Sequence, residues 1–317
     1  MVIGDAAHVF PPCKLPTASL CALSYRVLVG GQGLASGFRD ASSLAWRLAL
    51  SLKPGANYDS LLHAWYAERK QQLVRSIAMT VQNGQYVTER NWVKAKIRDW
   101  HLYAIQLFPG GRRMVESGGR AARGIRYRHE ESMPFDPTSG GFLLPQVYCA
   151  DISSRDSEDP LIHFTDDVIF SHNKTALFQI IVLLGSLEEY EEASSAIESI
   201  GKAPHSEVNL HETTFIIQST DLQELAPPNL THGLYRLATA EEFNNVKELS
   251  AGRPYPSFYD PLRMWKEVYR KRYIILRPDR LVFASSDSVE DLVHAIESIP
   301  EFVYTKQERS HNRTSKI

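Results

Sequence analysis

Apolar positions recur with helical spacing through the first third of the chain. Residues 40–53 carry apolar side chains on most sides, which predicts a largely buried helix. Asp40 is expected to cap its start, and Lys53-Pro54-Gly55 is expected to end it. Residues 86–108 predict another helix, closed by Pro109-Gly110-Gly111. Its expected buried face is Trp92, Ile97, Trp100, Tyr103, Ala104 and Leu107.

Residues 58–82 show the strongest separation of an apolar stripe from a polar face, and Asn83-Gly84 is expected to stop this helix. The predicted buried stripe is Leu61, Leu62, Trp65, Tyr66, Leu73, Ile77, Ala78 and Val81. The side chains expected in water are Glu68, Arg69, Lys70, Gln71 and Gln72.

From about residue 132 the pattern changes to short strands that alternate with helices, which predicts an α/β domain. The near-continuous apolar run 178–184 is typical of a strand buried on both faces. The other predicted elements are a helix over 187–200, a strand over 214–218, a hairpin of 273–276 with 281–284, and a closing helix over 286–299.

Charge divides the chain at about the same point. The net charge is −2 over 317 residues, but residues 1–130 carry +10 and the remainder carries −12. This shift supports a domain boundary near residue 130. The balanced total gives no general attraction to nucleic acid or membranes, and no apolar run approaches the ~20 residues of a membrane span. Three cysteines without a CxxC spacing, and nothing like a signal peptide, favour a reducing, cytoplasmic setting.

The opening residues combine a strand tip, a polar turn, a glycine loop and a helix. They are Gly4-Asp5-Ala6-Ala7-His8, Pro11-Pro12 and Gly30-Gly31-Gln32-Gly33, followed by the helix that contains Leu44-Ala45-Trp46. A carboxylate at a strand tip can accept hydrogen bonds from ligand hydroxyls. Glycines allow backbone N–H groups to approach a flat or anionic group, and the positive end of the helix favours negative charge there.

This arrangement resembles the second FAD fingerprint of the flavoprotein aromatic hydroxylases, the class A monooxygenases that include phenol 2-monooxygenase-like enzymes. The resemblance covers residues 4–50. It implies that the aspartate binds the ribityl chain of the flavin, that the proline-glycine loop lies against the isoalloxazine, and that the helix end stabilises negative charge on its pyrimidine side. The positions that match these roles are Asp5, Pro12, Gly31, Gln32 and Gly33.

The chain departs from the family pattern in two places. Residues 13–29 separate the prolines from the glycine loop, which are nearly adjacent in the family, and they are interpreted as either an added surface loop or a translated intron. No GxGxxG follows a strand anywhere in the chain, so the half of the family's FAD domain that binds the ADP pyrophosphate is expected to be missing.

The second half resembles the thioredoxin-like domain of phenol-hydroxylase-type enzymes, through Gly141-Phe142-Leu143-Leu144-Pro145-Gln146 and Arg277-Pro278-Asp279. The predicted fold is therefore α/β: a C-terminal remnant of a PHBH-type FAD-binding domain with long helices, then a thioredoxin-like α/β domain. The expected domains are 1–130 and 131–305, with a disordered tail at 306–317.

Other chemical candidates are weaker. His8 is interpreted as structural, because no second histidine stands at metal-ligand spacing, and no metal site is expected. Asp166-Asp167 fits a turn or helix cap better than a pair of catalytic carboxylates, and Cys149 fits the core. The arginines of residues 109–131 fit a solvated linker better than a nucleic-acid patch, because few aromatics lie between them. The absence of GxSxG and P-loop motifs argues against hydrolases and NTPases.

Two functions follow from the resemblance. The first is an FAD-dependent monooxygenase that uses NAD(P)H to hydroxylate a small aromatic substrate, and the close resemblance of residues 34–52 to the family suggests fungal secondary metabolism. The second is a flavin-free remnant or truncated gene product that acts, if at all, in interaction or dimerisation, as expected if the pyrophosphate site is lost. In either case the chain is expected to bind no nucleic acid or membrane, and a homodimer is a candidate assembly. No catalytic side chain is assigned.

Overall fold

The computed structural model describes residues 32–112, 124–130, 132–152, 161–201, 207–220, 230, 232–253, 255–256 and 259–305. The N-terminal motif up to Gly31, the insertion at 13–29 and the tail at 306–317 lie outside these ranges. The described chain forms two compact units. The first contains residues up to Ala45 and Trp65–Tyr127, and the second contains Trp46–Ala64 together with the residues from Arg128 onward.

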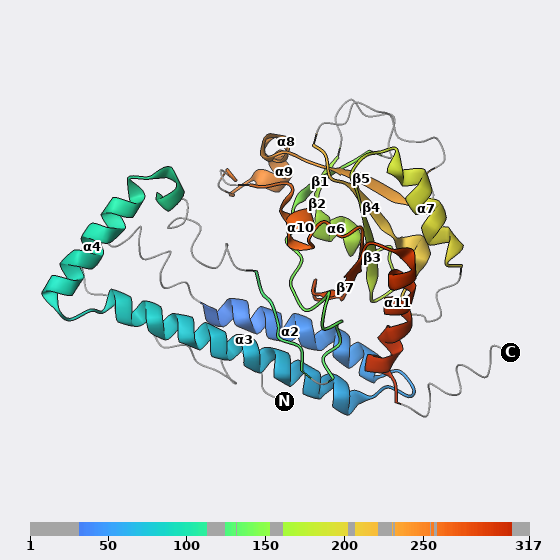
Figure 1. Cartoon of the computed structure of the whole chain (residues 1–317), viewed down its shortest axis with the longest axis horizontal. Coiled ribbons are helices and arrows are strands. Elements are labelled where there is room, and N and C mark those ends of the chain that lie inside the picture. Colours follow the sequence, from blue (N-terminus) through green and yellow to red (C-terminus); the bar gives the residue numbers. More distant parts are fainter. Residues whose placement is uncertain are drawn as a thin grey trace. The chain divides into compact units, whose positions relative to one another are not determined.

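Three long helices follow one another: α2 (Gln32–Ser51), α3 (Tyr58–Val87) and α4 (Trp92–Gln106) (Figure 1). Helix α2 begins eight residues before the predicted start, so Asp40 lies in its middle and the prediction of an Asp40 cap is wrong. Helix α3 continues through Asn83-Gly84, because one glycine costs a helix only about 1 kcal/mol. The break comes at Asn91, whose Oδ1 accepts hydrogen bonds from the N–H groups of Val93 and Lys94 at 3.0 and 3.3 Å.

The predicted faces of α3 and α4 are partly wrong. Glu68, Arg69 and Gln72, expected in water, are buried, whereas Tyr66 and Ile77 of the apolar stripe are exposed. Leu61 and Trp65 are buried as predicted. No residue of α4 is buried, so its apolar face points to solvent. Spacing identified these helices, but it did not show which face each one buries.

The second unit is built on a seven-stranded sheet in the order β2-β1-β5-β4-β3-β6-β7. Strands β3, β4 and β5 are parallel, and the remaining pairs are antiparallel. The strands are β1 (Tyr148–Asp151), β2 (Ile162–Phe164), β3 (Gln179–Leu184), β4 (Thr214–Ile217), β5 (Gly233–Leu237), β6 (Tyr273–Leu276) and β7 (Val282–Ser286). Every residue of β3, β4 and β6 is buried, which explains their unbroken apolar sequences.

Helices cover both faces of this sheet (Figure 1). They are α6 (Thr165–Ile169), α7 (Glu189–Ser199), the 3₁₀ turn η2 (Leu210–Glu212), α8 (Ala240–Asn245), α9 (Lys247–Ser250), α10 (Arg263–Glu267) and α11 (Val289–Val303). Ile216 packs in one core cluster with side chains of α6 and α10. On the other face the ring of Phe215 contacts Tyr190 of α7, and Phe283 contacts Phe302 of α11. Successive residues of a strand therefore serve opposite layers.

The predicted α/β class is confirmed. Strand β3, helix α7 and strand β4, then hairpin β6–β7 and helix α11, follow the order predicted for the thioredoxin-like part. Sequence analysis missed β1, β2 and β5, which are only three to five residues long and carry mixed side chains. Among the helices of the described ranges, none has the length and apolar character needed to cross a membrane.

The packing of Phe215 at the centre of the sheet gives a stability prediction. Its side chain is fully buried and contacts Tyr190 with ring centroids 5.1 Å apart. Phe215→Ala should lower the free energy of unfolding by about 3–5 kcal/mol, because it removes apolar contacts and leaves a cavity. Urea unfolding followed by tryptophan fluorescence measures the change. Leu161→Ala, at an exposed site, should change the free energy of unfolding by less than about 0.5 kcal/mol. An equal loss of stability in the two variants would contradict the placement of Phe215 in the core.

Candidate functional site

The structure describes two of the five residues predicted to contact a cofactor. Gln32 and Gly33 are the first two residues of α2. Asp5, Pro12 and Gly31 lie outside the described residues. The first turn of α2 contains no acidic residue, so no carboxylate of that turn offsets the partial positive charge at the start of this 20-residue helix. This end of α2 is therefore suited to a group that carries negative charge.

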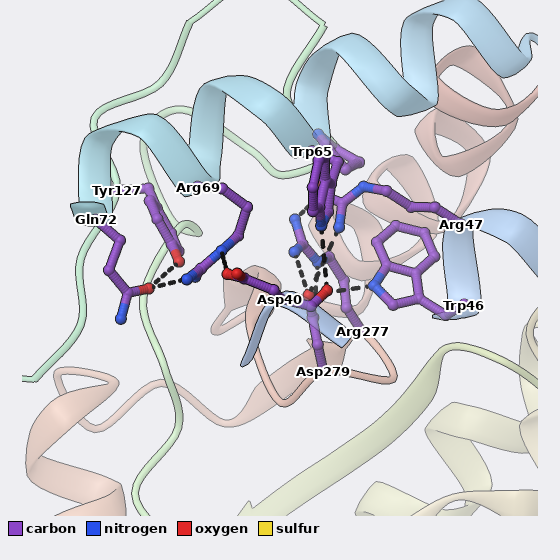
Figure 2. A network of polar contacts seen from close by, with 10 residues as sticks. Asp40, Trp46, Arg47, Trp65, Arg69, Gln72, Tyr127, Arg277 and Asp279 are labelled. Atoms are coloured by element: carbon purple, nitrogen blue, oxygen red, sulfur yellow. Dashed lines mark hydrogen bonds and ion pairs between the residues drawn. The ribbon is translucent and has the colours of Figure 1, made fainter. Parts of the chain in front are cut away.

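A buried ion pair holds the first half of α2 against α3 (Figure 2). Arg69 Nε donates to Asp40 Oδ1, and both residues are less than 10% exposed. The other guanidinium nitrogens donate to Gln72 Oε1 at 2.7 Å and to Ser36 Oγ at 3.2 Å. Tyr127 also donates to Gln72 Oε1, at 2.7 Å. Because Ser36 and Asp40 lie one turn apart on α2, these bonds set both its rotation and its axial position against α3.

The backbone of Asp40 takes part as well. Trp65 Nε1 donates to the Asp40 carbonyl oxygen at 3.3 Å. Arg69 therefore reaches the carboxylate of Asp40 while Trp65 reaches its main chain, and both donors come from adjacent turns of α3. Removing one member of such a buried pair leaves its partner uncompensated, which generally costs several kcal/mol. These contacts fix the position of α2 against α3 within the first unit.

The second half of α2 enters another cluster of buried charges, within the second unit. Arg277 donates to Asp279 through Nε at 3.0 Å and through Nη2 at 2.6 Å. Trp46 Nε1 donates to Asp279 Oδ2 at 3.1 Å, and Arg47 Nη1 lies 3.9 Å from the same oxygen. The guanidinium carbons of Arg47 and Arg277 lie 4.4 and 5.1 Å from the Trp46 ring centroid (Figure 2). The Arg277-Pro278-Asp279 segment thus attaches the hairpin β6–β7 to α2.

The charge state of Asp279 follows from these partners. Burial by itself would raise the pKa of its carboxyl, but the charge and hydrogen bonds of Arg277, helped by Arg47 and Trp46, lower the pKa below its ordinary value. Asp279 is therefore ionised at neutral pH. Both arginine side chains are fully buried, and the carboxylate of Asp279 lies within 3.9 Å of one guanidinium group and 2.6 Å of the other.

The connection between α2 and α3 is fixed separately to the end of the second unit. Lys53 Nζ donates to Glu207 at 3.1 Å, Tyr304 donates to the same carboxylate, and Asn57 N–H donates to the carbonyl oxygen of Val303 at 2.8 Å. Burial opposes ionisation of Glu207, but the hydrogen bonds from Tyr304 and Lys53 outweigh it and lower its pKa. Residues 46–64 thus belong structurally with the sheet domain.

The remaining sequence candidates have structural roles where they are described. Cys149 is fully buried in β1, and burial, followed by the charges of Asp151 and Asp167, raises the pKa of its thiol. This environment disfavours the thiolate, in agreement with the predicted core position. Asp166 lies in the first turn of α6 and pairs with Arg280 Nε at 2.9 Å. Within the described ranges no three His, Cys, Asp or Glu side chains gather as metal ligands, and His8 lies outside them.

Sequence reasoning missed the buried ionic clusters on α2. Asp40 was interpreted as a cap, and Arg69 and Gln72 were assigned to solvent. The available signal was the set of polar positions Ser36, Asp40, Ser43 and Arg47, which recur every three or four residues along α2 and are all buried. A polar stripe on the buried face of a helix requires partners, because unpaired buried polar groups are costly.

Comparisons with known proteins bear on this arrangement. No family model matches the chain. The chain is 28% identical over 174 residues to the 3-(3-hydroxy-phenyl)propionate/3-hydroxycinnamic acid hydroxylase of Mycolicibacterium gilvum, covering 53% of this chain and 26% of that protein. It is 32% identical over 109 residues to the protein of the same name from Comamonas testosteroni, covering 34% and 16%.

Among solved structures, the flavin-dependent monooxygenase PieE in complex with FAD and substrate aligns with a TM-score of 0.43 and 18% identity. That alignment covers 95% of this chain and 46% of PieE. The chain spans about a quarter of the length of the first curated relative. The sequence relatives confirm the predicted resemblance to flavin-dependent aromatic hydroxylases, over part of their length.

The Asp279 cluster gives a prediction with a pH signature. Asp279→Asn should lower the free energy of unfolding by about 3–5 kcal/mol at neutral pH, because it leaves two buried guanidinium groups beside a neutral amide. The folded pKa of Asp279 is lowered, so its ionised form contributes stability above the unfolded pKa of about 4 and loses it as the pH falls further. The difference between wild type and variant should therefore shrink below about pH 4.

Urea unfolding at a series of pH values measures this difference. Asp287→Asn is the matched control, since Asp287 is an exposed partner of Lys271 on the same unit. Its effect should stay below about 1 kcal/mol. A variant at position 279 that is as stable as wild type at neutral pH would show that the cluster contributes no net stability.

Proposed function

We propose that this chain is the C-terminal part of an FAD-dependent aromatic hydroxylase, and that Asp5, Pro12, Gly31, Gln32 and Gly33 form one side of its flavin site. The observation that supports it most is the start of α2: the Gln-Gly pair of the motif occupies the first turn of a long helix without acidic residues in that turn. The resemblance implies this placement for the helix that faces the pyrimidine side of the flavin.

The residues of this chain would act by binding and charge stabilisation. The carboxylate of Asp5 would accept hydrogen bonds from ribityl hydroxyls, and the N–H groups at the start of α2 would stabilise negative charge on the pyrimidine ring. The Asp40–Arg69 pair would hold α2 in place during this work. Reduced FAD supplies the activation of dioxygen when it is bound, so the protein contributes position and electrostatics.

The finer parts of the proposal rest on the relatives and the resemblance. The curated relatives are named for 3-(3-hydroxy-phenyl)propionate and 3-hydroxycinnamic acid, which are small phenolic acids. A small aromatic substrate, NAD(P)H as the reductant and a cytoplasmic location are proposed accordingly. A role in fungal secondary metabolism rests on the sequence of residues 34–52 alone. Residues 1–130 are proposed as the FAD-domain portion, and residues 131–305 as the C-terminal domain.

One observation favours a second candidate function. The chain has no GxGxxG after a strand, so the ADP portion of FAD would lack the helix end that usually holds its pyrophosphate. A flavin-free protein that serves in interaction is the alternative. The two candidates differ in whether the purified chain binds the isoalloxazine and ribityl parts of a flavin at all.

The flavin proposal predicts that three different flavins bind this chain with nearly equal affinity. The motif addresses the isoalloxazine and ribityl groups only, so riboflavin, FMN and FAD should bind the purified chain with dissociation constants that agree within about threefold, or about 0.7 kcal/mol. Titration by quenching of flavin fluorescence measures the three constants. Asp5→Ala should weaken all three by roughly tenfold, through loss of a hydrogen bond to a charged group.

The matched control is Asp59→Ala, which removes an acidic residue from the first turn of α3, outside the motif. It should leave the three constants unchanged. No quenching by any of the three flavins would favour the flavin-free alternative. FAD binding at least tenfold tighter than riboflavin would show that the chain contains a site for the ADP portion.

A further inference from the structure

The side chain of Lys174 reaches from the turn before β3 to the start of β4. Its Nζ donates a hydrogen bond to Thr214 Oγ1 at 2.5 Å, and Thr214 is only 2% exposed. The turn itself is held by the Lys174 N–H, which donates to the carbonyl oxygen of Ser171 at 2.9 Å. Lys174 is partly buried, whereas its neighbours His172 and Asn173 are exposed. The amine therefore lies near the surface of the sheet domain, but it is held against a buried strand.

The contacts of this amine compensate its charge poorly. Within the part of the chain that the structure describes, its hydrogen-bond partner is the neutral hydroxyl of Thr214, and it forms no ion pair. Burial lowers the pKa of Lys174 to about 8, although the charge of Glu212 acts in the opposite direction. A cation taken out of water beside a neutral partner is costly, so this environment favours the uncharged amine.

The carboxylate of Glu212 is occupied by other donors. Its Oε1 accepts hydrogen bonds from the Thr175 N–H at 2.9 Å, the Thr175 hydroxyl at 2.8 Å and Asn209 Nδ2 at 2.9 Å. Its Oε2 accepts from the Ala176 N–H at 3.0 Å and from Gln179 Nε2 at 3.3 Å. Burial opposes ionisation of this carboxyl, but the hydrogen bonds outweigh it and lower its pKa to about 2. Glu212 thus holds the segment that leads into β3 and does not pair directly with the lysine.

We propose that Lys174 is a modification site, at which its side-chain amine takes an acyl group from a small acyl phosphate. The lone pair of the neutral Nζ attacks the acyl carbon, where a carbon–nitrogen bond forms. The bond between that carbon and the phosphate oxygen breaks, and phosphate leaves with the electron pair. The proton lost from the nitrogen passes to phosphate or water. The products are a neutral amide on Lys174 and inorganic phosphate.

The surroundings of Lys174 suit the amide product. An acylated lysine keeps one N–H, which can donate to Thr214 Oγ1 in place of the ammonium group. The positive charge is lost, so the cost of holding it away from water is removed. Because Lys174 is partly buried, the acyl group and its donor must be compact. Acetyl phosphate meets this requirement and is the probe for the site.

Acetylation of the full chain by acetyl phosphate tests this proposal. Lys247, an exposed lysine of the same unit, is the internal comparison. At about pH 7.5, an amine with a pKa of about 8 is roughly one quarter neutral, whereas an ordinary lysine side chain is only about 0.1% neutral. Partial burial slows the approach of the donor, so Lys174 should be acetylated at least about tenfold faster than Lys247. Mass spectrometry of peptides measures both rates, and Lys174→Arg should abolish the faster one.

The unfolded chain separates the effect of the fold from that of the local sequence. In about 6 M guanidinium chloride the buried environment is lost, so the two lysines should react at rates within about threefold of each other. In the folded chain the rate at Lys174 should level off above about pH 8, where the amine is mostly neutral. Equal rates at Lys174 and Lys247 in the folded chain, or a rate at Lys174 that still rises at about pH 10, would overturn the proposal.

Thr214→Val tests the contribution of the hydroxyl. The variant removes the acceptor of the ammonium group and keeps a side chain of similar shape, so the midpoint of the pH profile at Lys174 should move roughly one pH unit lower. Circular dichroism should show that the variant keeps the helix content of the wild type. An unchanged midpoint in the folded variant would overturn the assigned role of Thr214.

Discussion

The ionised carboxylate of Asp279 is the contact on which the attachment of α2 to the sheet domain depends. Two fully buried guanidinium groups, from Arg47 on the helix and Arg277 on the hairpin, lie beside this negative charge. Trp46 completes the cluster with a hydrogen bond and an aromatic face for both cations. Without the carboxylate, both guanidinium groups would lose an oppositely charged partner in a medium that screens charges weakly.

The same device recurs in the first unit, where Asp40 and Arg69 join α2 to α3. Buried ion pairs contribute little net stability compared with apolar packing, because desolvation offsets most of their attraction. Their geometry is strict, however, since a guanidinium satisfies its donors only at one rotation and one axial position of the helix. These pairs therefore fix the rotation and axial position of α2 more than they stabilise the fold. A helix whose first turn is proposed to face a ligand needs its register fixed.

The sequence predicted the positions of helices and strands better than it predicted which of their faces are buried. The buried strands β3, β4 and β6 and the hairpin at Arg277-Pro278-Asp279 came from unbroken apolar runs and turn residues, which report local structure directly. The reversed faces of α3 and α4 could not be found this way, because helical spacing shows that a face exists without showing what covers it. Of the candidate site, only Gln32 and Gly33 are placed, at the start of α2, while Asp5, Pro12 and Gly31 remain predictions from the motif.

The order of the chain has a consequence for how the sheet domain is completed. Residues 46–64 belong to it, yet some 60 residues of the other unit separate them from its first strand. During synthesis, Trp46 and Arg47 leave the ribosome long before Phe178, Asp279 and Val303 are made. This helical segment therefore cannot pack against the sheet domain until the rest of that domain has been synthesised. Trp46 also contacts the ring of Phe178, with ring centroids 6.0 Å apart. A fragment that begins at the apparent boundary near residue 128 would lack residues 46–64, and would expose this face of Phe178 and the Arg277–Asp279 turn to water.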